Sequence, residues 1–228
     1  MENPWHRLPQ SPPFVLPEDE VVVRAFNKGA REKYRLRVND LLPEPFVGGL
    51  DASVVLLSNN PGFTPEGAAR KKEARFRARM RSNLDHGPSD YPFVFFAPDI
   101  DDGHKTWWNR KLKGLLHFGY AKLAASILVV EHFPYASQRY SRKRLDLPSQ
   151  AQDYNFQLVQ QAIEQQKLIV LMRGRHRWFR DVQKLCKYDR LCTLRNPQAG
   201  SISAGNCERF EEIAQAIAAH AGRPEDSG

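Results

Sequence analysis

Four short, continuous apolar runs punctuate this sequence, at 54–57, 126–130, 168–172 and 191–194. Each is rich in Val, Ile and Leu, which is typical of strands buried on both faces. Helical patterns follow the runs in turn, at 67–83, 106–124, 149–166, 177–185 and 207–219. This alternation predicts an α/β three-layer sandwich, with a four-stranded, mostly parallel sheet flanked by helices.

The length and composition indicate one globular domain over 1–228. The chain has 228 residues, of which 41% are hydrophobic, enough to build one core. We expect the Pro-rich residues 1–18 to be irregular, a helix within 18–38 and a Pro-broken connector over 41–46. The core is expected at about 50–220.

The charge and the cysteines bound the class of protein. The formal net charge of +8 favours a polyanionic partner. No apolar run reaches the roughly 18 residues of a membrane span, so a soluble, cytoplasmic monomer without membrane contact is expected. The three cysteines are odd in number and widely spaced, which predicts neither a disulfide framework nor a metal site, and we expect no cofactor.

Two polar loops follow the first and the last apolar run. One contains Asn60 beside Pro61, and the other contains Asn196 beside Pro197. In an open α/β sheet, ligands bind outside the carboxyl ends of the strands. The two loops therefore predict a two-sided active site.

These loops resemble the motifs of the uracil-DNA glycosylase superfamily, especially its mismatch-specific uracil/thymine branch. The segment Ser58-Asn59-Asn60-Pro61-Gly62 is similar to the first motif, Gly-Ile-Asn-Pro-Gly, and 196–201 resembles the second, Asn-Pro-Ser-Gly-Leu-Ser. The resemblance spans about 50–220. Ser58 replaces the first glycine, the second motif departs after Pro197, and a four-cysteine cluster set is absent, so the chain resembles a divergent member.

The resemblance implies an enzyme that flips a base out of DNA and hydrolyses its bond to the sugar. By this resemblance Asn60 positions the water, Asn196 contacts the departing base, and Asn59 and Phe63 belong to the base site. Further DNA contacts would come from the second loop, at Gln198, Ser201 and Ser203. Each Asn has an alternative role as a turn or helix-capping residue.

The second apolar run ends in a group of candidate base-reading residues, Glu131, His132 and Tyr135. Strand alternation allows only one of Glu131 and His132 to face the pocket. A carboxylate accepts hydrogen bonds, so Glu131 would favour an amino-bearing base such as a cytosine derivative. The alternatives are an ion pair for Glu131 and a core or surface position for His132.

Two basic runs are candidate phosphate contacts. In 70–81, seven of twelve residues are Lys or Arg and one is Glu, and clustered like charge is costly unless a polyanion relieves it. The predicted contacts are Arg75, Arg77, Arg79, Arg81, Arg142 and Lys143. The alternative for 70–81 is a solvated helix face.

The predicted function is a monofunctional DNA glycosylase that leaves an abasic site, acting on double- or single-stranded DNA. Neither motif contains a Lys, so a Schiff-base lyase step is not indicated. The substrate is either a modified cytosine of phage DNA, in antiviral defence, or a uracil or thymine mismatch, in repair. The rival class is a non-catalytic nucleic-acid-binding protein with this fold.

Overall fold

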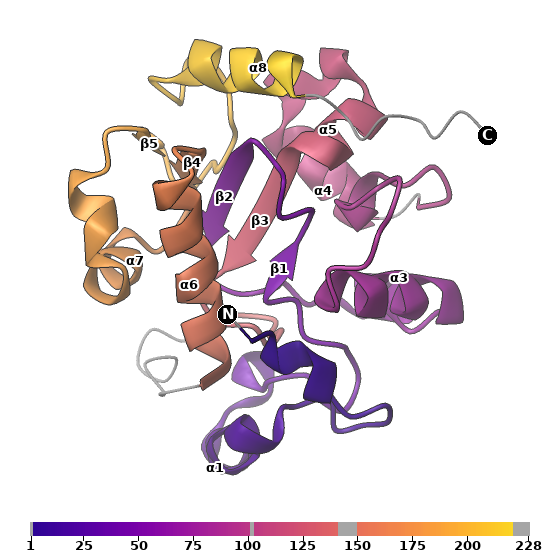
Figure 1. Cartoon of the computed structure of the whole chain (residues 1–228). Helices are drawn as coiled ribbons and strands as arrows, with labels where there is room; N and C mark the ends of the chain where they lie inside the picture. Colours follow the sequence, from indigo (N-terminus) through magenta and orange to yellow (C-terminus); the bar gives the residue numbers. More distant parts are fainter. Residues whose placement is uncertain (1, 101–102, 141–149, 221–228) are drawn as a thin grey trace.

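The computed structural model describes residues 2–100, 103–140 and 150–220. Figure 1 shows a mixed sheet flanked by helices. The strands lie in the order β1-β3-β2-β4-β5. Their bounds are β1 Phe46–Val47, β2 Val54–Ser58, β3 Ile127–Glu131, β4 Leu168–Leu171 and β5 Leu191–Thr193.

The four predicted strands are present, but the sheet has five strands rather than four. The fifth, β1, pairs antiparallel with β3, with Phe46 opposite Val130, whereas the other pairings are parallel. A two-residue strand beside Pro43 and Pro45 has no periodicity to reveal it. Its pairing depends on β3, which lies far away in the sequence.

The helices are shorter than the sequence patterns suggest. Two predicted helices are divided, 67–83 into α2 and α3 and 106–124 into α4, a 3-10 helix and α5; Glu73 is extended between the first pair, and Gly119 has a φ of 82° before α5. The α-helices are α1 Glu20–Gly29, α2 Pro65–Lys71, α3 Ala74–Leu84, α4 Gly103–Lys111, α5 Tyr120–Ser126, α6 Gln150–Glu164, α7 Arg175–Asp181 and α8 Phe210–Ala219. The 3-10 helices are Pro4–Arg7, Pro17–Asp19, Glu32–Tyr34, Val94–Phe96, Lys113–Phe118 and Gln183–Lys187.

The core begins much earlier in the chain than the predicted residue 50. Trp5, Phe14 and Leu16 are buried in the same hydrophobic cluster as the central strands. The segment 2–18 is therefore an integral part of the core, although it contains little regular structure beyond two 3-10 turns. Among the described residues, no helix is long and apolar enough to cross a membrane.

The absence of a disulfide was a wrong prediction. Cys192 of β5 is bonded to Cys207, which precedes α8, and Cys186 is free and exposed. The two partners are fifteen residues apart in sequence. An isolated bridge between Leu194 and Cys207 brings the two segments together, and this long-range pairing is invisible in the spacing of the cysteines.

The order of the strands creates a crevice at one edge of the sheet. The chain passes from β2 to β3 on one side and then returns to β4 on the other side of β2. At such a reversal, the connections leave the strands in opposite directions and open a space outside their carboxyl ends. Ser58 and Glu131 are paired in register there, each as the last residue of its strand.

Candidate functional site

A cavity of about 410 Å³ lies at this reversal point. It is lined by Ser58 and Glu131 at the ends of β2 and β3, by Met172 directly after β4, and by the loop after β2. Aromatic side chains from other elements, Phe95, Trp107 and Trp108, complete its wall. The cavity lies beyond the strand ends, between mostly apolar walls, and its volume is in the range of small-molecule sites.

Glu131 is the buried acid of this cavity. The residue is 9% exposed, and its Oε2 has no hydrogen-bond partner among the described residues. Burial raises its pKa to about 8, and Glu44 adds to the rise, while Ser58 and the charges of Arg173 and Lys71 oppose it. At neutral pH the protonated acid therefore predominates, so Glu131 offers a donor as well as an acceptor rather than acting only as the expected acceptor.

A buried ion pair stands beside Glu131. Lys71 and Glu44 both line the cavity, and their side chains are almost completely buried and paired with each other. The Lys71 ammonium also lies 5.7 Å from the centre of the Phe95 ring. Lys71 therefore belongs to the cavity wall, although in sequence it is part of the basic run 70–81.

Asn60 reaches the cavity with a defined amide orientation. Its Nδ2 donates to the Ser137 hydroxyl at 3.0 Å and lies 3.4 Å from the Tyr135 carbonyl oxygen. The Ser137 hydroxyl donates in turn to the carbonyl of Arg139, which fixes the direction of these bonds. The Asn60 Oδ1 accepts no hydrogen bond from the described residues, so it is the atom that remains to accept one from a water in the cavity.

Phe63 and Asn59 lie at different depths around the same loop. Phe63 lines the cavity and is half-buried, with the Arg37 guanidinium 4.4 Å from its ring centre. Asn59 is not among the lining residues. Its side chain points towards the turn after β4, where its Oδ1 is buried next to Gly174 and accepts no hydrogen bond from the residues that the structure describes.

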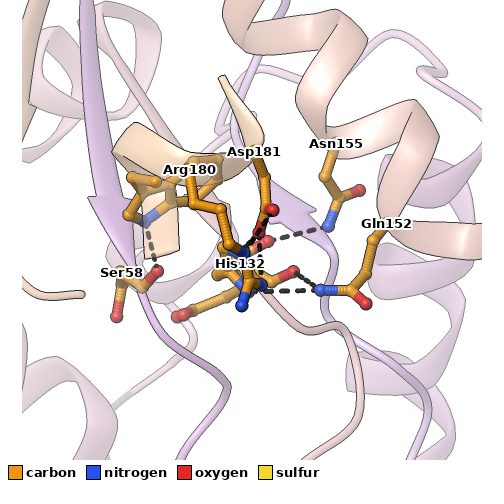
Figure 2. Close-up of polar contacts among 8 residues, drawn as sticks. Ser58, His132, Gln152, Asn155, Arg180 and Asp181 are labelled. Carbon is orange, nitrogen blue, oxygen red and sulfur yellow. Dashed lines mark hydrogen bonds and ion pairs between the residues drawn. The ribbon is translucent and has the colours of Figure 1, made fainter. Parts of the chain in front are cut away.

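His132 lies on the side of β3 that faces away from the cavity. Figure 2 shows it among Gln152, Arg180 and Asp181, and its Nε2 is 2.7 Å from the Asp181 carboxylate. Its pKa is lowered by burial, against the opposing effect of Asp181. Strand alternation therefore brings Glu131, not His132, to the cavity. Tyr135 is also outside it, because its hydroxyl is buried against Asp19.

The second motif contributes its glycine to the cavity rather than its asparagine. Asn196 is exposed, and its Oδ1 accepts hydrogen bonds from the backbone amides of Gln198 and Ala199, both at 3.1 Å. This is the turn-capping arrangement weighed as the alternative. Gly200 lines the cavity, whereas Gln198, Ser201 and Ser203 do not.

The predicted phosphate contacts in 70–81 have partners within the protein. Arg75 and Arg79 share the carboxylate of Asp99, each at 2.8 Å. Arg77 and Arg81 lie over the ring of Phe14, and Arg81 also donates to backbone carbonyls. Arg75 and Arg79 therefore have an acidic partner, whereas Arg77 and Arg81 form no salt bridge among the described residues. Arg142 and Lys143 lie outside the described residues.

Sequence reasoning missed several residues of the cavity. Arg110 and Lys111 come from α4, Arg173 comes from the turn after β4, and Glu44 comes from the connector before β1. Only Arg173 carried a sequence signal, because it follows a strand. Within the described part of the chain, no group of three His, Cys, Asp or Glu side chains could hold a metal ion.

Comparison of the chain with family models, with curated proteins and with solved structures gave no significant match.

Proposed function

We propose that this protein is a monofunctional DNA glycosylase, a divergent member of the uracil-DNA glycosylase superfamily with its helix–sheet–helix layering. One observation carries the proposal: the reversal-point cavity is lined by both Asn60 and Glu131. Asn60, which can hold a water, and Glu131, a buried acid that can face a base edge, would therefore act in the same cavity. The partner is DNA and the product an abasic site.

The reaction uses these residues in separate roles. The target base leaves the stack, enters the cavity and stacks on Phe63. Asn60 holds a water through its free Oδ1, and the water oxygen bonds to C1′ of the sugar while the bond between C1′ and the base nitrogen breaks. The base leaves with the bonding electrons, and the proton lost by the attacking water ends on the departed base, so the products are an abasic sugar hydroxyl and a neutral base. Glu131 in its protonated form donates a hydrogen bond to the developing negative charge.

The preferred substrate is a cytosine enlarged at C5, removed from foreign DNA in antiviral defence. Protonated Glu131 can accept from the cytosine amino group and donate to the adjacent ring nitrogen. Phe95 and Trp107 line the same cavity as Glu131 and would provide an aromatic wall for a C5 substituent. Unmodified cytosine would lack this contact.

A uracil or thymine mismatch is the alternative substrate, and the state of Glu131 supports it. The uracil edge presents an N–H beside a carbonyl oxygen, and a protonated carboxyl can accept from the first and donate to the second. Glu131 in this form therefore does not distinguish the two classes, and the space at C5 would have to do so.

Substitution of Asn60 tests the proposal. Wild-type protein should form abasic sites in oligonucleotides carrying a C5-enlarged cytosine, measured by alkaline strand cleavage, with matched uracil, thymine-mismatch and plain-cytosine strands alongside. Asn60→Ala should lose at least about 100-fold in rate, because the water is no longer held in line, while DNA affinity is retained.

The exposed residue Gln161 provides a control, and Gln161→Ala should cleave as the wild type does. Equal rates for Asn60→Ala and wild type would overturn the role of Asn60. DNA binding without abasic sites on any strand of the set would instead indicate the non-catalytic class.

A further inference from the structure

We propose that Arg110, Lys111 and Arg173 form a phosphate-binding site at the mouth of the cavity, which holds the DNA backbone beside the base that enters it. This inference rests on the proposed function and identifies the backbone contact that 70–81 was expected to make. All three residues line the cavity. Arg110 and Arg173 are exposed whereas Glu131 is buried, so the cations mark the open side and the acid the closed side.

The three cations come from separate parts of the chain but lie close enough to affect one another. The pKa of Lys111 is lowered, first by partial burial and then by the charges of Arg173 and Arg110. Within the described residues, none of the three is in a salt bridge; Lys111 donates one hydrogen bond to the uncharged carbonyl of Ala199. Like charges gathered without a salt-bridge partner in the described part of the chain are the electrostatic footprint of a polyanion site.

The position of α4 does not explain this gathering. Arg110 and Lys111 occupy the last turn of the helix, where cations interact favourably with the helix dipole. Arg173 follows β4, however, and its charge opposes those two. The helix dipole of α4 therefore accounts for Arg110 and Lys111 but not for Arg173, the third cation beside them.

The closed end of the same cavity supplies independent evidence for a ligand. The Glu131 Oε2 is buried there and has no hydrogen-bond partner in the described part of the chain, which is costly unless a bound molecule supplies one. A cavity with a polar acid at its floor and positive charge at its mouth matches a nucleotide, whose base edge and phosphate lie at opposite ends.

The second polar loop orders this site. The amide of Ile202 donates to the Lys111 carbonyl at 2.7 Å, while the Lys111 ammonium donates to Ala199. The same ammonium lies 5.0 Å from the Trp107 ring centre. The loop therefore acts by holding Lys111 at the mouth.

A salt-dependent binding experiment tests the inference. The variant Arg110→Gln, Lys111→Gln, Arg173→Gln is compared with Arg70→Gln, Lys72→Gln, Arg75→Gln, which removes the same charge from residues already paired with Glu73, Asp40 and Asp99. Affinity for labelled duplex DNA is measured by fluorescence anisotropy from 50 to 200 mM salt. The slope of log affinity against log salt should fall by up to about 2.7 in the first variant, about 0.9 per phosphate contact.

The outcomes separate this site from the proposed reaction. An unchanged slope in the first variant, or an equal loss in both variants, would overturn the phosphate site even if abasic sites still form. The expected slope loss without abasic sites would uphold the phosphate site and overturn the glycosylase. RNA of the same sequence and a nucleoside monophosphate are run in parallel, and tighter binding of either through these cations would overturn the assignment to DNA.

Discussion

Glu131 shows how one buried side chain can set the chemistry of a site. Its position at the end of β3 is determined by strand pairing, because Glu131 lies opposite Ser58 in register. Its protonation is determined by burial, which outweighs the opposing charges of Arg173 and Lys71. The Glu131 carboxyl, which would be ionised in the unfolded chain at neutral pH, is therefore mostly neutral in the folded protein and can both donate and accept a hydrogen bond.

The raised pKa of Glu131 predicts a pH-dependent stability. Between the ordinary value of 4.5 and about 8, the unfolded carboxyl is ionised while the folded one stays protonated, so the folded state binds more protons. The free energy of unfolding should therefore fall as pH rises through this window, by at most about 1.4 kcal/mol per pH unit, and level off above it. Glu131→Gln should remove this fall.

Urea unfolding of wild type and Glu131→Gln at pH 5 to 9 measures the effect. The exposed Glu164 of α6 provides the matched control, because Glu164→Gln removes a carboxyl without removing a buried one. A stability difference between wild type and Glu131→Gln that is constant across the pH range would contradict the prediction.

The turn between β4 and α7 contains Gly174, which packs against Asn59 in the loop after β2. Gly174 has a φ of 78°, in the left-handed region, and precedes the first residue of α7. A Cβ at this position would lie 2.2 Å from the Asn59 Oδ1. A residue with a side chain would therefore be strained at position 174 and would also displace Asn59. Asn59 belongs to the loop that carries Asn60, so the turn supports that loop.

Gly174→Ala should destabilise the protein by about 1–2 kcal/mol from backbone conformation, with a further cost from displacing Asn59. The midpoint of urea unfolding measures this. Gly205→Ala is the control, because a Cβ there meets no atom within 4 Å and its φ is not left-handed. The same midpoint for both variants would show that the turn carries no such constraint.

The N-terminal segment packs against the connection that follows β3, through Trp5, Leu16 and Asp19. Trp5 is 2% exposed and meets Tyr135 edge-on, with ring centres 6.3 Å apart. Tyr135 in turn donates to Asp19 and accepts from the amide of Leu16. Residues far apart in sequence are thus packed around the connection that follows β3, next to the anchor of Asn60.

Trp5→Ala should cost about 3–5 kcal/mol of stability, the usual loss for a large buried aromatic side chain. Thermal and urea unfolding followed by circular dichroism measure it. Val21→Ala, at an exposed position of α1, should change stability by less than about 0.5 kcal/mol. A Trp5→Ala loss as small as that of the control would mean that the segment is only loosely attached.

The strand runs were readable because continuous apolar stretches bounded by polar loops have few other ways to be buried. The same logic indicated that Asn60 follows a strand end and that strand alternation would divide Glu131 from His132. Local patterns of this kind are encoded within a few neighbouring residues.

Long-range contacts decided the rest. Strand β1, the Cys192–Cys207 bond and the burial of Trp5 each depend on partners that the sequence does not place side by side. Arg75 and Arg79 pair with Asp99, and Arg173 lines the same cavity as Lys111, because side chains meet by their position in space rather than by their order in the chain. For that reason the sequence predicted a site beyond the strand ends, while the packing selected which cations and which acid line it.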